Sequence, residues 1–228
     1  MITIRIKNAD PLFDIREAIA ATLGKDSLPA PKEDLFEYYK KLFVQNHSVV
    51  RAVNFRIKDN ESDKATARQL LRATTGHPQP YMQSSRPDWC GKERDEFEKV
   101  FFLHDHTAES FLNEARQRLC FRAWKPTREK VLDIVHTMWH SDDPYFKALA
   151  FCAVPNCVHQ FGCPEGKFNC GWWDRQDFPA DIMSRREKYL KECIKSKVLY
   201  LSWCLVLKDM RQNLRCCLSL RMKMGIIV

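Results

Sequence analysis

The chain opens with a strict alternation of apolar and polar side chains. Residues 2–7 read Ile-Thr-Ile-Arg-Ile-Lys, and residues 53–58 repeat the alternation as Val-Asn-Phe-Arg-Ile-Lys. A strand with one buried face requires this period of two, because successive side chains point to opposite sides of a sheet. The pattern therefore predicts two half-buried strands.

Elsewhere the apolar positions follow the spacing of a helix face. This spacing predicts helices over 11–23, 33–46, 64–73 and 107–122, and a further helix starting at Pro126. Residues 76–95 are dense in Gly, Pro, Ser and Asp, which indicates a loop. Residues 150–173 are rich in cysteine and follow neither period, so we expect them to be irregular.

Composition narrows the class of protein. The 228 residues are 45% hydrophobic and 29% charged, which suits a soluble globular protein with one good core. The net charge of +8 favours anionic partners such as nucleotides, nucleic acid or an anionic membrane; alternatively, it reflects a solvated basic surface.

No secretory signal precedes the first strand, and the longest apolar run, residues 198–207, is too short to span a bilayer. We therefore expect a cytoplasmic protein with no membrane segment. In that compartment the ten cysteines are expected to be thiols or metal ligands rather than disulfides. The glycines form no Gly-x-Gly-x-x-Gly motif and no phosphate-binding loop, so a dinucleotide would not be held in the common Rossmann way.

The segment 69–86 carries the polar groups best suited to a small phosphorylated ligand. Gln69 and Arg72 end an amphipathic stretch, and Ser84 and Arg86 follow a loop broken by Gly and Pro. Arginine forks bind phosphate bidentately, while a Gln and a Ser hydroxyl can orient the rest of the ligand. This pattern predicts a nucleotide-like site.

The predicted helix 107–122 places Arg118 and Arg122 at the edge of its apolar face. Such an arginine either covers apolar surface with its stem or directs its guanidinium into a cleft, where it can bind phosphate. His47 and Ser48 precede the second strand; His47 either contributes to a site or caps the preceding helix.

The segment 150–173 contains a set of thiols that can be considered as ligands for zinc. Turn-forming Pro and Gly separate the members, which are Cys152, Cys157, Cys163 and Cys170. Their spacings lack the two-residue knuckle that nucleates most structural zinc sites, so free thiols are favoured over zinc.

Three further groups have a structural interpretation that we favour. The sequence His104-Asp105-His106 suggests a metal pair, but with no further carboxylate cluster nearby, helix capping is the better interpretation. His136 and His140 lie one helical turn apart without the Glu of a zinc protease. The basic stretch 185–197 is expected to be a solvated helix face, with a nucleic-acid contact as the alternative.

Several of these segments resemble, in the same order, elements of the flavin-dependent thymidylate synthases. Residues 69–72 match part of that family's Gln-x-x-Arg-His-Arg, and residues 84–86 match part of its Ser-x-Arg-Tyr. Residues 47–52 are similar to its His-Ser-x-x-Glu-His element, and residues 107–122 to its Asn-Ala-Arg-Ser helix. Residues 163–171 resemble the Cys-Pro-Glu-Gly-x3-Cys-Gly tail of some bacterial members. The resemblance covers roughly residues 35–172.

The resemblance implies an α/β (α+β) fold with a mixed sheet flanked by helices, and a homotetramer with sites shared between subunits. It implies reductive methylation of dUMP to dTMP, in which methylenetetrahydrofolate supplies the carbon and NADPH reduces FAD. The residues it assigns to the nucleotide are Gln69, Ser84, Arg86 and Arg118, with Ser84 as the candidate catalytic residue. Those it assigns to the flavin cofactor are His47, Ser48 and Arg72, with Arg72 near either the phosphate or the flavin.

Departures from the family motifs fall mainly on the flavin side. Ala52 replaces a His, Ala73 and Thr74 replace a His-Arg pair, and Met82 replaces a Glu. The chain is therefore expected either to be a divergent synthase or to be a nucleotide-binding relative without synthase activity. We expect residues 1–183 to form the synthase-like domain, with the cysteine-rich segment inside it, and residues 184–228 to form a tail of unknown role.

The rival interpretation is a basic, zinc-stapled module that binds nucleic acid. Its features are the net charge of +8, the cysteines, and Trp172 and Trp173 as stacking platforms for bases. We consider a nucleic-acid partner less favoured than dUMP and folate.

Overall fold

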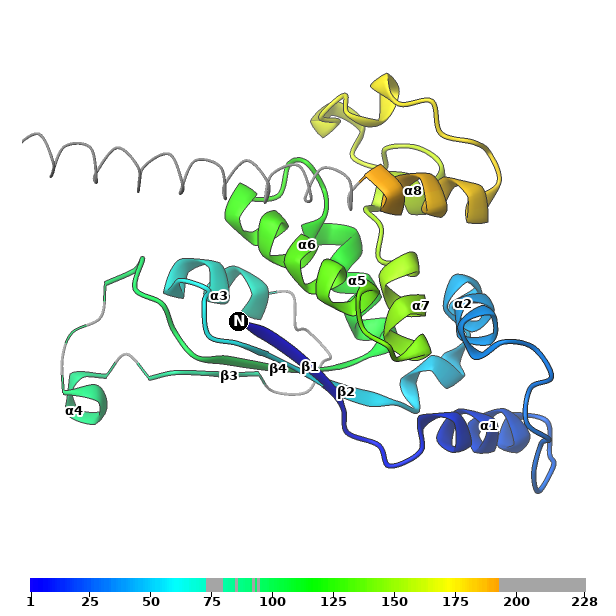
Figure 1. Cartoon of the computed structure of the whole chain (residues 1–228). Coiled ribbons are helices and arrows are strands. Elements are labelled where there is room, and N and C mark those ends of the chain that lie inside the picture. The colour runs from blue at the N-terminus through cyan, green and yellow to red at the C-terminus, as the bar shows by residue number, and fades with distance from the viewer. Residues whose placement is uncertain (73–79, 85, 92, 94, 193–228) are drawn as a thin grey trace, which may run out of the picture. The chain divides into compact units, whose positions relative to one another are not determined.

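The structure is a computed structural model of the chain, and it describes residues 1–72, 80–84, 86–91, 93 and 95–192 (Figure 1). The chain divides into two compact units, Met1–Tyr189 and Leu190–Val228. The first unit extends beyond residue 183, where the sequence suggested the domain would end. Of the expected tail, residues 193–228 lie outside the described part.

In the described part of the chain, the fold centres on a four-stranded sheet (Figure 1). Its order is β1 (Ile2–Ile6), β2 (Asn54–Asp59), β4 (Phe102–Thr107) and β3 (Tyr81–Met82). Every pairing between these neighbours is antiparallel. The α+β class predicted from the sequence is thus confirmed, but in the described residues the sheet is antiparallel rather than mixed.

The two faces of the sheet differ in chemistry. The register places Ile4 opposite Ile57 and Ile57 opposite His104, so these side chains share one face. Helices cover that face. The other face carries Arg56 opposite Asp105. The guanidinium of Arg56 donates two hydrogen bonds to the Asp105 carboxylate, from Nε at 2.6 Å and from Nη2 at 2.8 Å. Both predicted strands are therefore confirmed; the apolar face is half-buried in β1 and buried in β2.

Helices form close to each of the five predicted ranges, and in the described residues further helices form at Pro87–Cys90, Pro144–Cys152 and Asn156–Gln160, where none was predicted. The helices are α1 (Pro11–Thr22), α2 (Leu35–Gln45), α3 (Lys64–Leu71), α4 (Pro87–Cys90), α5 (Ala108–Arg118), α6 (Lys125–Trp139), α7 (Pro144–Cys152) and α8 (Asn156–Gln160). Short 3-10 turns lie at Ser48–Arg51 (η1), Gly166–Phe168 (η2) and Trp173–Arg175 (η3). The side chains of Asp10, Asp34 and Asp63 cap α1, α2 and α3 by accepting from backbone N–H groups, which fixes where these helices begin.

An aromatic cluster joins α2 and α7 to the sheet. Tyr145 of α7 meets Tyr39 and Phe43 edge-on at ring distances of 5.3 and 5.2 Å. Phe55 of β2 lies 5.6 Å from Phe146 in a similar T-shaped contact. All five rings are buried. Such edge-to-face pairs add specificity to the large apolar area that the rings remove from water.

Strand β4 runs directly into α5, and this junction positions the candidate site. Thr107 is the N-cap, and its side chain and that of Ser110 form a reciprocal capping box. His104 and His106 both lie in β4, so the expectation that this pair serves a helix cap is wrong. Thr107 takes that role because its hydroxyl accepts the Ser110 N–H.

The start of the basic stretch 185–197 is not a solvated face. Arg185 is 3% exposed and Arg186 is 0% exposed. Arg186 donates to Cys152 O at 2.8 Å, and Arg185 donates to Ala180 O at 2.6 Å. Both guanidiniums therefore hold backbone carbonyls inside the first unit. In the part of the chain that the structure describes, no helix is both long and apolar enough to cross a membrane.

Candidate functional site

Two of the predicted nucleotide-binding residues meet at the C-terminal ends of α3 and α5. The Nη2 of Arg118 donates a 2.7 Å hydrogen bond to the backbone carbonyl of Gln69, across 49 residues of sequence. The Nε of Arg118 is buried and has no hydrogen-bond partner in the described part of the chain. The guanidinium is thus fixed in position with donors still available.

Ser84 and Arg86 lie elsewhere in the chain, beyond the short edge strand β3. Ser84 Oγ accepts the Arg86 backbone N–H at 3.2 Å. The exposed Arg86 side chain pairs with Asp88 at 2.5 Å and lies over the Trp89 ring. Figure 1 shows α4, which follows Arg86, well apart from α5. Within one chain the structure therefore does not bring Arg86 to Arg118.

The predicted flavin-side residues are on the surface. His47, Ser48 and Arg72 are all exposed. His47 is the N-cap of η1, where its Nδ1 accepts the Val49 N–H at 3.5 Å, so it caps the helix that follows and not the one that precedes it. Arg72 ends α3 as its C-cap. The side chains of these residues do not enclose a flavin within the described part of one chain.

The cysteines divide into two environments. Cys157, Cys163 and Cys170 line one cavity of about 220 Å³ together with Cys120, which sequence analysis did not include. Cys152 is instead fully buried at the end of α7, under Arg186. Among the described residues, no three sulfur atoms lie within 4.8 Å of one another. None of these five cysteines forms a disulfide in the structure, and the preference for free thiols over zinc stays a prediction.

Burial governs the chemistry of two of these thiols. It raises the pKa of Cys152 to about 11, although the charges of Arg186 and Arg116 oppose the shift. Burial also raises the pKa of Cys157 to about 12, assisted by the neighbouring Cys120, Cys163 and Cys170. Neither thiol is poised as a nucleophile, because the thiolate is the reactive form.

The two tryptophans of the cysteine-rich segment pack on aromatic rings of the same chain. Trp172 stacks on Phe121 at 4.7 Å, and Trp173 stacks on Phe178 at 5.2 Å. Each indole thus has one face occupied. A stacking platform for bases needs open ring faces, so this packing does not favour the nucleic-acid interpretation.

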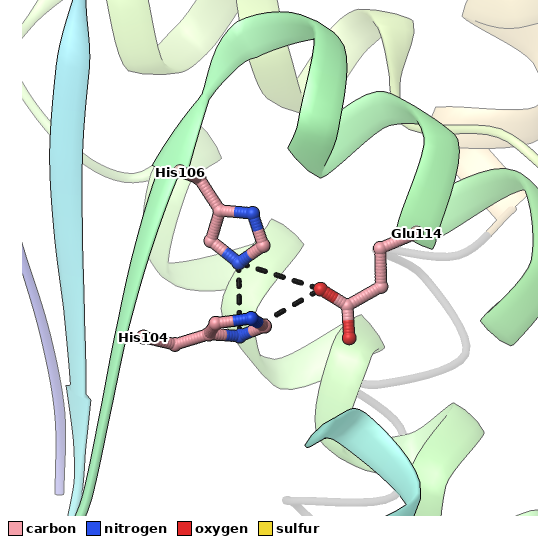
Figure 2. Close-up of side chains that lie close together, drawn as sticks. All are labelled: His104, His106 and Glu114. Carbon is pink, nitrogen blue, oxygen red and sulfur yellow. Dashed lines mark hydrogen bonds and ion pairs between the residues drawn. The ribbon is translucent and has the colours of Figure 1, made fainter. Parts of the chain in front are cut away.

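A third group, for which the sequence favoured a structural role, is a close cluster of three ionisable side chains in the described part of the chain. Figure 2 shows His104 and His106 of β4 converging on Glu114 of α5. His106 Nε2 lies 2.9 Å from His104 Nδ1 and 3.3 Å from Glu114 Oε2. His104 Nδ1 lies 3.7 Å from the same oxygen. The three side chains are 2%, 0% and 3% exposed.

The electrostatics of the cluster are set by burial. Burial raises the pKa of Glu114 to about 8, against the opposing charge of Arg118 one turn later. The Oε1 atom of Glu114 has no hydrogen-bond partner among the described residues. A buried carboxyl in this state must be protonated or neutralised by a cation, since an unpaired carboxylate is costly to bury.

The sequence contained a signal for this cluster. Two histidines two positions apart in a strand point to the same face, and Glu114 falls on the side of its helix that holds Phe111 and Ala115, which are buried. The helix that carries Glu114 comes directly after this strand. A carboxylate on the apolar face of such a helix is expected to be buried and to need a polar partner, which the two histidines can supply. The expectation that no carboxylate lies near the histidines was therefore wrong.

Comparison of the chain with models of known protein families and with curated proteins finds no match.

Proposed function

We propose that the protein binds dUMP and acts in its flavin-dependent methylation to dTMP, with Gln69 and Arg118 as the part of the nucleotide site that one chain supplies. The observation that carries the proposal is the hydrogen bond from Arg118 to Gln69 O. These residues belong to two motifs of the resembled family that are distant in sequence. Their contact is what a single site built from both motifs would need.

The unused hydrogen-bond donors of the Arg118 guanidinium suit a phosphate ligand. Its guanidinium has five donors, and the described contact to Gln69 uses one nitrogen. Arg118 and Arg122 also border the cavity of about 220 Å³. That volume is small for a whole dinucleotide but suits a phosphate or a single ring, since ordinary ligand pockets begin at about 300 Å³.

A charge-reversed pair supports the alignment with the family motifs. Arg51 falls at the Glu position of the His-Ser-x-x-Glu-His element, and Glu109 falls at the Arg position of the Asn-Ala-Arg-Ser helix. In this chain the two residues pair, with Arg51 Nη2 at 2.9 Å from Glu109 Oε1. Both departures thus reverse the charge that the motif has at that position, and the two reversed side chains pair in this chain.

The remaining candidates fit a site completed by a second subunit. Arg86, His47, Ser48 and Arg72 are exposed, and the family's sites are shared within a homotetramer. FAD, when bound, would supply the hydride, and NADPH would reduce it. Because Ala52, Ala73 and Thr74 replace polar side chains of the family motifs, we expect FAD to bind more weakly than in a well-matched member.

Calorimetry with dUMP tests the proposal. Loss of one charge-assisted phosphate contact costs about 1.5–3 kcal/mol, so Arg118→Ala is expected to weaken dUMP binding by about ten- to a hundredfold. Arg5→Ala, an exposed arginine of β1, is the matched control and should bind dUMP normally. Arg86→Ala tests the second subunit's share in the same way.

Two further measurements separate binding from catalysis. The visible spectrum of the protein with added FAD reports flavin binding, and a coupled assay with methylenetetrahydrofolate and NADPH reports dTMP formation. dUMP binding without turnover would assign the chain as a nucleotide-binding relative. Unchanged dUMP affinity in both Arg118→Ala and Arg86→Ala would reject the proposal, and tight binding of single-stranded nucleic acid instead would favour the rival interpretation.

A further inference from the structure

We propose that His104, His106 and Glu114 form a closed binding site for one divalent transition-metal ion, zinc in the first instance, that fastens α5 to β4. The inference is independent of the proposed function, because none of these three residues is among those that the resemblance assigns to the nucleotide or to the flavin.

The geometry is close to that of a metal site. The ligand atoms His104 Nδ1, His106 Nε2 and Glu114 Oε2 all lie within 4.8 Å of one another. Zinc binds imidazole nitrogen and carboxylate oxygen at about 2.0–2.2 Å, so tetrahedral ligands are separated by about 3.3 Å. The observed separations of 2.9, 3.3 and 3.7 Å bracket this value. Small side-chain rotations are therefore sufficient to admit an ion.

The hydrogen bonds around His106 direct a lone pair to the centre of the group. Ser110 Oγ donates its proton to Thr107 O at 3.1 Å. With the hydroxyl so directed, His106 Nδ1, 3.1 Å from Ser110 Oγ, is the donor in their contact, which corresponds to one of the two neutral tautomers of the ring. In this neutral form of the ring, Nε2 carries no proton, and its lone pair points toward His104 and Glu114. Fixing the tautomer of a ligand histidine through its other nitrogen is a usual feature of metal sites.

The Glu114 carboxylate gives a second, independent reason to expect a bound cation. When Glu114 is ionised, its Oε2 and the His106 Nε2 lone pair are both acceptors, and they lie 3.3 Å apart in the interior. Glu114 Oε1 is also buried and has no partner in the described residues. A divalent cation between these atoms resolves both problems, because it takes the lone pairs and compensates the buried charge, and Oε1 can approach it as a second oxygen ligand.

The class of ion follows from the donors. Two imidazoles and a carboxylate suit zinc and other first-row metals such as iron, cobalt and manganese, whereas magnesium and calcium prefer oxygen alone. The site is closed to solvent on the evidence of its burial. A closed site is structural, so the ion would enter during folding and add to stability.

The test uses the full chain produced in medium supplemented with zinc or with cobalt and then dialysed. Elemental analysis is expected to find about one ion per chain, and the cobalt form is expected to show visible d–d bands without a thiolate charge-transfer band. The absence of that band separates this site from the cysteine-lined cavity. His106→Gln and Glu114→Gln should each weaken metal retention by at least about tenfold.

Asp105→Asn is the matched control. Asp105 lies between the two histidines in the same strand but on the opposite face, where it pairs with Arg56, so this variant should keep its metal. A second control, Cys157→Ser with Cys163→Ser, should also keep it. The inference fails if the wild-type chain retains no ion, if retention is unchanged in His106→Gln and Glu114→Gln, or if the cysteine variant alone loses it. If a triad variant does not fold, the wild-type cobalt spectrum without a thiolate band, together with metal retention in the cysteine variant, still tests the inference.

Discussion

Arg118 reaches from the end of α5 to the backbone carbonyl of Gln69 at the end of α3, at 2.7 Å. The contact ties two helices that are distant in sequence and holds the guanidinium at a fixed place. Because the acceptor is a backbone oxygen, the contact depends on the fold of α3 and not on the identity of residue 69. It leaves the Gln69 side chain available to a ligand.

This arrangement predicts that lysine cannot replace Arg118. A lysine keeps the charge but lacks the planar fork that can donate to Gln69 O and to a phosphate together. We expect Arg118→Lys to weaken dUMP binding by about tenfold while the unfolding midpoint changes little. Calorimetry and urea unfolding, with Arg5→Lys as the control, measure the two effects. Full dUMP affinity in Arg118→Lys would show that charge alone suffices.

Acid should weaken the open face of the sheet. The hydrogen bond from Arg56, assisted by Lys7, lowers the pKa of Asp105 below its ordinary value. Its stabilising effect is therefore complete above an unfolded-state pKa of about 3.9 and is lost as the pH falls through the lower folded-state value. Asp105→Asn should cost about 1–2 kcal/mol at pH 7, after allowance for the partly exposed partners.

The check is urea unfolding of both proteins at pH 7 and at about pH 3. The difference between wild type and Asp105→Asn should shrink at the lower pH. A difference that stays constant with pH would mean that Asp105 contributes through packing or neutral hydrogen bonds instead of its charge.

A separate pH dependence is expected from His159. Burial lowers its pKa to about 4, and the charges of Arg116, Arg186 and Arg185 act in the same direction. Its ring nitrogen Nδ1 lies 2.9 Å from Arg186 Nη2, which requires the neutral form to accept. Between an unfolded-state pKa of about 6.5 and the folded value, only the unfolded chain takes up a proton, so stability falls as the pH is lowered through this window.

His159→Gln removes the titrating group and offers an amide oxygen to Arg186 in its place. The loss of stability between pH 7 and about pH 5 should therefore be smaller in His159→Gln than in wild type. One group can contribute at most about 1.4 kcal/mol per pH unit, and His159 is only part-buried, so we expect less. Parallel pH profiles of the two proteins would contradict the assignment.

Thiol labelling distinguishes the two cysteine environments. The high pKa values of Cys152 and Cys157 keep both protonated near pH 8, and Cys152 is 0% exposed. We expect both to react with iodoacetamide about a hundredfold more slowly than an ordinary free cysteine in the native state, and normally after unfolding. Peptide mass spectrometry reads out each site. If a chelator accelerates labelling of Cys157, the cavity thiols hold metal and the free-thiol prediction is wrong.

The sequence alone determined the secondary elements of the first unit to a large extent. The alternation in residues 2–7 and 53–58 predicted two strands, and the helical spacing of apolar residues predicted most of the described helices. These features are local, because a period of two or 3.6 and a capping side chain act within a few residues. The third and fourth strands were missed: Phe102–Thr107 has buried residues on both faces and so shows no simple alternation, and Tyr81–Met82 is only two residues long.

Only the tertiary structure decided which side chains meet. It places Gln69 against Arg118 and Arg86 away from both. The cysteine-lined cavity contains Cys120, which the sequence did not suggest, and does not contain Cys152, which it did. The tertiary structure also places Glu114 against His104 and His106. Such side-chain contacts depend on the strand register and on how α5 packs against the sheet. One chain contains many pairs of segments whose local patterns would allow similar contacts. The contacts are chosen by the packing of the whole core, which no single segment encodes.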